Sequence, residues 1–408
     1  MNLKQYKIFR LALLIFLFSF FIFSLANESL FLWSMQGYLI IASIFLINRL
    51  FFVSFANLFP KKYPRKNNPY VVILPVKNES PEILNRCIKM LIRQKGTKQI
   101  LIGDDGSSPI LSKIIKPEYL SQIELIRSKG VGKKEMQLRL LKKAKYNYVI
   151  QMDSDIILEG DNALKKLVSY FSESNKIGII NGKIKLISEK NLLEKIQEFQ
   201  YMCANEIGRS GMGRFGINPC ATGELLAFRL DVFRNYLEEY RNTKHIDQLM
   251  RFGEDRFMTN IFLREGYKSI VAEDVVCYTY PKKQFTTLMK QQIRWKRSGI
   301  RESLRCAREV KNPYLKVWSI LNFFLPMIFY ILFLNLLIYD IYFQDWSGIL
   351  LLFSSLITIS LISEIPIFIK KPSMIVWAVP FMFYNILLIT PLWFVSVFTQ
   401  TQTKWGTR

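Results

Sequence analysis

Long apolar runs occupy both ends of the chain. Two lie near the N-terminus, at residues 9–25 and 38–59, and three lie near the C-terminus, at 317–342, 349–369 and 375–398. Because a helix needs roughly 20 apolar residues to cross a bilayer, the pattern predicts two transmembrane helices within residues 1–60 and a second bundle at 317–400. A cleaved signal peptide is the alternative for the first run, but Asn27-Glu28-Ser29 offers no small-residue cleavage site.

Between residues 67 and 283, the apolar runs are much shorter and alternate with stretches of helical periodicity. Runs rich in valine and isoleucine at 70–75, 98–103, 123–126 and 148–152 read as buried strands, and residues 81–94 and 133–145 have helical periodicity. This alternation predicts an α/β domain with a mostly parallel, doubly wound sheet. Ligands of such sheets bind at the carboxyl ends of the strands.

The distribution of charge predicts how the chain is oriented in the membrane. The 408 residues include 56 Lys and Arg against 32 Asp and Glu, a net charge of +24, although half of the chain is hydrophobic. Basic residues flank the apolar runs, whereas the links 26–37 and 344–348 contain none. The positive-inside rule predicts a multi-pass plasma (inner) membrane protein whose N-terminus and middle region are cytoplasmic.

The last apolar run is expected to be irregular. Pro380 and Pro391 interrupt it, and Lys404 and Arg408 lie beyond it. A kinked or re-entrant segment that returns to the cytoplasm would reconcile these charges with the predicted orientation.

Cysteine and histidine usage narrows the possible chemistry. The five cysteines include no C-x-x-C pair, which fits a reducing cytoplasm and argues against structural zinc. His245 is the only histidine, so a multi-histidine metal site is excluded and Ser-His and Cys-His nucleophile pairs are not expected. Acid-base chemistry is therefore expected from carboxylates.

Acidic residues follow two of the predicted strands. Asp104 and Asp105 end one strand, and Asp153 and Asp155 follow another. Carboxylates at i and i+2 can converge on a hard divalent cation, Mg²⁺ or Mn²⁺, that also binds phosphates. A solvated loop or helix cap is the alternative for an isolated D-x-D. Lys133, which could offer a cation to a diphosphate, favours a nucleotide-diphosphate site.

Two further motifs allow more than one interpretation. Glu254, Asp255 and Arg256 begin a helical stretch, so Asp255 is either a cap of that helix or a general base in a cleft. Gln291, Arg294 and Trp295 share one face of an amphipathic helix predicted for residues 284–312. That helix suits both sugar binding and the membrane surface.

In their order along the chain, these motifs resemble the processive family 2 glycosyltransferases of the GT-A fold, the group of hyaluronan, chitin and cellulose synthases. The resemblance extends from about residue 70 to residue 408 and depends on DDGSS, GKK, DSD, GEDR, QQIRW and a terminal WGTR. It implies a GT-A-type (Rossmann-like) cytoplasmic catalytic domain at 67–283, inserted between N- and C-terminal transmembrane helices.

The resemblance also implies a role for each motif residue. Asp255 would be the catalytic base, with Glu254 and Arg256 beside it, and Asp153 and Asp155 would bind Mg²⁺ or Mn²⁺. The donor nucleotide would contact Asp104, Asp105, Lys133, Asp153, Arg294 and a gating tail at 401–408 with Trp405, Thr407 and Arg408. The acceptor would contact Cys220, Gly223, Glu224, Gln291 and Trp295.

The expected activity is processive, inverting polymerisation of sugars from UDP-sugar donors, with extrusion of the polysaccharide through the bilayer and without a dedicated export subunit. The motifs favour hyaluronan synthases, which use UDP-GlcNAc and UDP-GlcA. Chito-oligosaccharide synthases and glucose/glucuronate capsule synthases remain alternatives, because Glu254 resembles the chitin type and Glu224 stands where hyaluronan synthases have proline.

The sequence disfavours two other classes of protein. A nucleotide-regulated membrane transporter is disfavoured because Arg49 and Glu364 are nearly the only ionisable residues of the apolar segments. A nucleic-acid-binding membrane protein is disfavoured because the basic residues gather beside the membrane segments. No nucleic acid partner is therefore expected.

Overall fold

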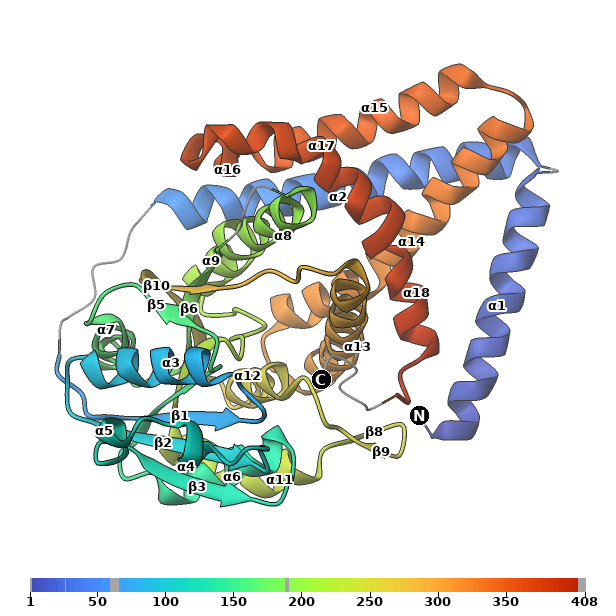
Figure 1. Cartoon of the computed structure of the whole chain (residues 1–408). Helices are drawn as coiled ribbons and strands as arrows, with labels where there is room; N and C mark the ends of the chain where they lie inside the picture. Colours follow the sequence, from blue (N-terminus) through green and yellow to red (C-terminus); the bar gives the residue numbers. More distant parts are fainter. Residues whose placement is uncertain (1, 26, 59–65, 188–190, 403–408) are drawn as a thin grey trace.

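The computed structural model describes residues 2–25, 27–58, 66–187 and 191–402. In Figure 1 an α/β unit lies at the lower left, and long apolar helices lie above it and to its right. The chain enters the α/β unit from the first two apolar helices and leaves it for the last three. The sequence predicted this order of parts.

Four parallel strands form one half of the main sheet. They are β1 (Tyr70–Val76), β2 (Lys98–Asp105), β3 (Glu124–Ser128) and β4 (Tyr148–Met152). Helix α3 (Pro81–Arg93) begins where Ser80 Oγ accepts a hydrogen bond from the Ile83 amide at 3.3 Å, and α6 (Lys133–Lys143) precedes β4. The strand and helix positions predicted for this half are confirmed.

The other half of the sheet corrects the prediction of a mostly parallel sheet. The strand order is β3-β2-β1-β4-β7-β6-β10-β5, and β7 (Leu225–Arg229) runs antiparallel to both β4 and β6 (Ile177–Leu186). Strand β10 (Lys268–Thr279) is parallel to β6, and β5 (Ile157–Leu158) pairs antiparallel at the edge. The physical reason is that the chain between β6 and β7 forms helices beneath the apolar bundle instead of crossing over the sheet, so β7 returns in the opposite direction.

Further helices and strands complete the α/β unit. They are α4 (Leu111–Ile114), α5 (Pro117–Leu120), α7 (Ala163–Ser169), α8 (Leu192–Met202), a π-helical stretch (Cys203–Arg209), α9 (Ser210–Arg214), α10 (Leu230–Phe233), α11 (Leu237–Asn242), β8 (Lys244–His245), β9 (Gln248–Leu249), α12 (Glu254–Arg264) and α13 (Phe285–Glu309).

Apolar side chains fill both faces of the sheet. One layer packs Leu84 and Ile88 of α3 against the strands. The opposite layer packs Met136 of α6 and Phe262 of α12 against the other face. These two layers fix α6 and α12 at their places on the sheet, and the N-terminal ends of these two helices carry Lys133 and Asp255.

Five helical segments of the described chain are long and apolar enough to cross a membrane, as predicted. They are α1 (Leu3–Leu25), α2 (Glu28–Leu58), α14 (Pro313–Tyr342), α15 (Trp346–Ser363) and the segment Pro372–Phe398, which contains α17 (Ile375–Tyr384), a π-helical turn (Asn385–Ile389) and α18 (Pro391–Phe398). Many of their apolar side chains are exposed, as in proteins whose helices face lipid.

Both ends of the segment Pro372–Phe398 lie against helices of the α/β unit. Before it, Lys370 of α16 (Ile365–Lys370) pairs with Glu206 at 2.6 Å. At its other end, Ser396 Oγ donates to the Ile293 carbonyl of α13 at 3.3 Å. The π-helical turn directly before Pro391 is a usual cause of a helix bend, and Figure 1 shows the chain turning between α17 and α18. The kink expected from Pro380 and Pro391 therefore has a structural counterpart.

Candidate functional site

The turn after β2 is organised by its two aspartates. Asp104 is buried, and its carboxylate accepts hydrogen bonds from the amides of Ser107 at 2.8 Å and Leu111 at 3.2 Å. Asp105 accepts from the amide of Gly132 at 2.9 Å. Both predicted nucleotide-binding carboxylates thus engage the chain itself, and Asp105 holds the loop from which α6 begins.

Lys133 joins three motifs that are far apart in the sequence. Its Nζ lies 2.8 Å from Asp153 Oδ1 and 3.3 Å from Glu254 Oε1. Burial lowers the pKa of Lys133, but the charges of Asp153 and Glu254 more than offset that effect, and the net pKa is raised. The lysine stays protonated and neutralises two carboxylates at the carboxyl edge of the sheet.

The D-x-D residues follow β4 directly. Asp153 and Asp155 are half-buried, and Ser154 between them donates a hydrogen bond to Glu79 at 2.6 Å. Burial raises the pKa of Asp155, and the neighbouring charge of Asp153 raises it further. A bound cation would remove this penalty.

Asp153 and Asp155 supply only part of the ligand set of a divalent cation. Among the described residues, no three or more His, Cys, Asp and Glu side chains gather as a complete metal site. Mg²⁺ characteristically takes one or two carboxylates and completes its shell with water and substrate phosphates. The oxygen ligands of this pair therefore fit such a cation together with a diphosphate.

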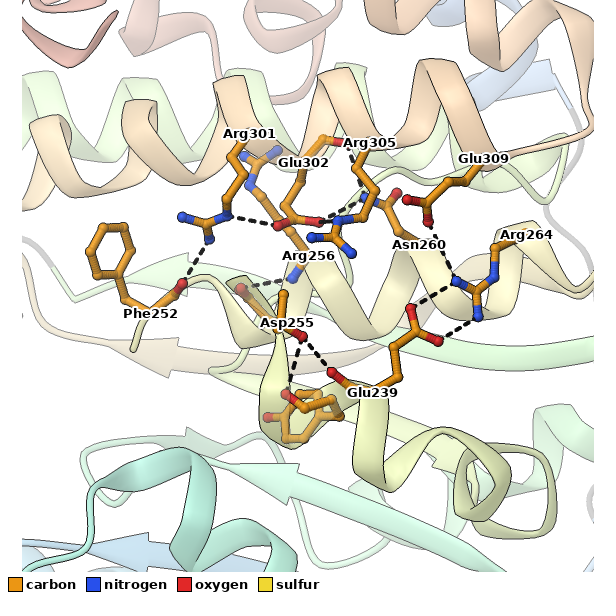
Figure 2. A network of polar contacts seen from close by, with 12 residues as sticks. Glu239, Phe252, Asp255, Arg256, Asn260, Arg264, Arg301, Glu302, Arg305 and Glu309 are labelled. Atoms are coloured by element: carbon orange, nitrogen blue, oxygen red, sulfur yellow. Dashed lines mark hydrogen bonds and ion pairs between the residues drawn. The ribbon is translucent and has the colours of Figure 1, made fainter. Parts of the chain in front are cut away.

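Asp255 lies in the first turn of α12 and faces the segment before β7. Its Oδ2 accepts from the Gly223 amide at 3.3 Å and lies 3.9 Å from Cys220 Sγ, while Oδ1 accepts from the Arg256 amide at 2.8 Å. Figure 2 shows Asp255 directed away from α13 and Arg256 extended toward it. The structure thus brings the predicted base together with two predicted acceptor residues, Cys220 and Gly223.

Glu224 completes this acidic group. Burial raises the pKa of its carboxyl, and the charges of Asp153 and Asp255 add to the shift, against the effect of Arg209. Burial raises the pKa of the Tyr201 hydroxyl, and the charge of Glu224 raises it further. Sequence reasoning missed Tyr201 and Arg209, because they lie in a helix and a π-helical stretch without a recognisable motif.

Helix α13 forms the wall opposite these carboxylates. The Trp295 ring lies 6.2 Å from the Tyr201 ring, measured between centroids. Burial lowers the pKa of Arg294, whereas the nearby charges of Glu254 and Asp255 oppose the shift. Arg294 and Trp295 therefore face the site. Gln291 is half-buried.

Gln292, beside Gln291, was not predicted to be important. It is buried and exchanges two amide hydrogen bonds with Gln200 of α8, at 3.2 and 3.3 Å. This amide pair connects α13 to α8. A sequence offers no sign of such a pairing, since the two glutamines are 92 residues apart.

A buried charge network attaches α13 to α12 (Figure 2). Arg301 donates to the Phe252 carbonyl at 2.8 Å and pairs with Glu302 at the same distance. Asn260 of α12 donates to Glu302 Oε2 at 3.1 Å. Arg301 and Glu302 are each only 3% exposed, so these contacts are shielded from water and hold the loop that precedes Asp255.

The predicted gating residues Trp405, Thr407 and Arg408 lie outside the described residues. Their role remains a prediction.

Comparisons with known proteins identify the class to which this fold and site belong. Residues 67–298, more than half of the chain, match the family described as glycosyltransferase like family 2. The chain belongs to this family and is a glycosyltransferase. The enzyme class expected from the motifs is confirmed.

Named relatives extend the comparison beyond the catalytic region. Hyaluronan synthase of Streptococcus pyogenes is 25% identical over 362 residues, which cover 85% of each chain. N-acetylglucosaminyltransferase of Neorhizobium galegae is 28% identical over 242 residues, covering 57% of this chain and 55% of the relative. The chain is therefore similar to both kinds of enzyme.

A solved structure confirms the fold class. The mannosyltransferase PcManGT from Pyrobaculum calidifontis, in complex with GDP-Man and Mn²⁺, superimposes with a TM-score of 0.60 at 14% identity. The match covers 88% of this chain and 98% of that one. The GT-A-like fold predicted from the sequence is thus confirmed.

Gly253, at the N-terminus of α12, supplies a first prediction. Its φ is +81°, and a Cβ there would collide with Ser298 and Arg301, whereas Gly266 has φ +82° and open space around it. Gly266→Ala should cost about 1–2 kcal/mol of backbone strain alone. Gly253→Ala should lower the melting temperature further and reduce glycosyl transfer about 100-fold, because Asp255, the predicted base, is displaced. Equal melting temperatures and activities of the two variants would contradict this account.

The charge pairing of Lys133 supplies a second prediction. Lys133→Met leaves Glu254, whose side chain is only 8% exposed, without its counter-ion. We expect a loss of about 3–5 kcal/mol, measured as a lower melting temperature in detergent. The double variant Lys133→Met, Glu254→Gln should recover part of that loss, since the buried charge is gone. An additive loss in the double variant would show that the two residues are not coupled.

Proposed function

We propose that the chain is a processive inverting β-glycosyltransferase that polymerises sugars from UDP-sugar donors and extrudes the polysaccharide across the membrane, with hyaluronan as its product. The observation that carries the proposal is the cluster around Lys133, which places the D-x-D loop and the Asp255 helix at one edge of the sheet. The similarity to hyaluronan synthase over 85% of both chains supports the choice of product.

The donor site lies at the carboxyl edge of the sheet. Asp153 and Asp155 would hold Mg²⁺ or Mn²⁺, which neutralises charge developing on the departing diphosphate. The similar mannosyltransferase was solved with GDP-Man and Mn²⁺. Lys133 and Arg294 supply further positive charge. The loop shaped by Asp104 and Asp105 receives the nucleoside, and the tail with Trp405, Thr407 and Arg408 closes over it.

Asp255 acts as the general base on the acceptor hydroxyl. Its Oδ2 is oriented by the Gly223 amide at 3.3 Å, and the carboxylate removes the proton as the hydroxyl attacks the anomeric carbon from the face opposite UDP. Glu254, paired with Lys133, fixes the first turn of α12. The cationic side chains around the leaving group stabilise its negative charge.

The acceptor sugar occupies the space between α13 and the segment before β7. Cys220, Gly223 and Glu224 form one wall, and Gln291 and Trp295 form the other. Stacking on the Trp295 ring positions the sugar for attack. The raised pKa of Glu224 favours its protonated form, which can donate a hydrogen bond to a sugar oxygen.

The membrane helices serve as anchor and exit path. The basic residues beside the apolar segments favour a cytoplasmic catalytic domain in the plasma membrane. The last segment, both ends of which contact the α/β unit, fits a chain that re-enters and returns. Repeated addition would push the polymer through this bundle, so no dedicated export subunit is required.

Two observations favour a second product, a chito-oligosaccharide. The N-acetylglucosaminyltransferase relative is 28% identical, and Glu254 resembles the chitin-type motif. A chito-oligosaccharide synthase would need UDP-GlcNAc alone. A glucose/glucuronate polymer is the third choice, since Glu224 departs from the hyaluronan pattern.

The role of Asp255 leads to a third prediction. Asp255→Asn removes the base and should reduce UDP release from a UDP-sugar by about 100-fold or more, with Mg²⁺ or Mn²⁺ present. The measurement is a coupled UDP assay on purified protein in detergent. Asp161→Asn, which alters an exposed aspartate, serves as the matched control and should retain activity. Turnover that survives in Asp255→Asn would remove this residue from the base role.

A donor panel gives the fourth prediction. Purified enzyme should make polymer only when UDP-GlcNAc and UDP-GlcA are both supplied, and radiolabel from each should enter the product. Polymer made from UDP-GlcNAc alone would instead establish chito-oligosaccharide synthesis, and a requirement for UDP-Glc with UDP-GlcA would establish the glucose/glucuronate alternative.

A further inference from the structure

Two basic side chains lie side by side between the base helix and the membrane bundle. A Cβ placed on Gly299 of α13 would lie 3.9 Å from Arg256 Cζ, so the Arg256 guanidinium rests against that helix. Lys296, three residues before Gly299, shares the same face of α13, and the charge of Arg256 acts on it. Two half-buried cations therefore occupy one region.

Among the residues that the structure describes, neither cation is neutralised by a carboxylate. Within the described residues, the Arg256 and Lys296 side chains have no ion pair and no hydrogen bond. The contact of Lys296 is with the Trp393 ring of α18, whose centroid lies 4.8 Å from Nζ. Neighbouring like charges removed from water are unfavourable unless an anion compensates them. Lys133 and Arg301, by contrast, each pair with a carboxylate.

Two anions could compensate this charge, the diphosphate of the donor or an acidic group of the acceptor. The surroundings of the two cations distinguish between them. Arg294 faces the carboxylates of the donor site, whereas Lys296 faces Trp393 of an apolar segment. Arg256 also acts electrostatically on Cys220, which lies beside Asp255. The pair therefore extends the acceptor site from Cys220 toward the apolar segment that carries Trp393.

We propose that Arg256 and Lys296 form an anion subsite that binds the carboxylate of a uronic acid in the growing polysaccharide. The proposal rests on the proposed function, and it makes the acceptor chain an acidic one. Burial and the charge of Arg256 lower the pKa of Lys296 to about 8, and a bound carboxylate would raise that pKa and so stabilise the charged form. The buried Trp393 ring contacts the Lys296 ammonium and holds it at this position.

Direct binding to the full chain in detergent tests this subsite. Tryptophan fluorescence is titrated with an alternating GlcNAc–GlcA hexasaccharide, with neutral chitohexaose and with UDP. The unsubstituted chain should bind the acidic sugar about tenfold more tightly than the neutral one. Lys296→Gln should reduce that preference to about twofold or less, and Lys296→Arg should retain it. Lys290→Gln, which alters an exposed lysine of the same helix, is the matched control and should leave the preference unchanged.

Three outcomes would overturn the subsite. They are equal binding of the two hexasaccharides by the unsubstituted chain, a preference that survives in Lys296→Gln, and a loss in that variant confined to UDP, which would assign the cations to the donor diphosphate. UDP release from UDP-GlcNAc by the unsubstituted chain is measured in parallel. Its absence would count against the proposed function itself, whereas release without an acidic preference would overturn only the subsite.

Discussion

The site depends on one interaction, the pairing of the Lys133 ammonium with two carboxylates. Asp153 ends β4, and Glu254 begins α12, so without a shared cation the edge of the sheet would bring like charges together. Lys133 converts that repulsion into a fixed arrangement. Because Asp255 follows Glu254, the position of the proposed base relative to the D-x-D loop is determined by the same contact. Burial strengthens this coupling, since screening by water is reduced.

Helix α13 connects this arrangement of charges to the apolar bundle. On one side it presents Arg294 and Trp295 to the carboxylates, and through Arg301 and Glu302 it holds the loop before α12. On the other side its residue Ile300 packs with Phe323 of α14 and other apolar residues of the bundle. The same helix thus contacts both the carboxylates of the site and the apolar bundle, so a shift of α13 would alter both sets of contacts.

The sequence predicted what depends on local pattern. Strands β1 to β4, helices α3 and α6 and the five apolar segments follow from periodicity, and the enzyme class follows from the ordered motifs. The direction of β7 could not be predicted, because it depends on where the chain between β6 and β7 packs. The pairing of Lys133 with Glu254 and the contact of Tyr201 with Trp295 connect residues distant in sequence, and only tertiary packing creates them. The roles assigned to individual site residues stay predictions.

The contact between the first and the last apolar segments has a consequence for biosynthesis. Tyr6 donates a hydrogen bond to the Val397 carbonyl at 2.5 Å and accepts one from the Gln400 amide at 2.9 Å. The first of these bonds joins residues 391 positions apart. During translation α1 must therefore wait for this neighbour until α18 has been synthesised, long after the α/β unit. The contact between α1 and α18 can thus form only once the α/β unit has left the ribosome.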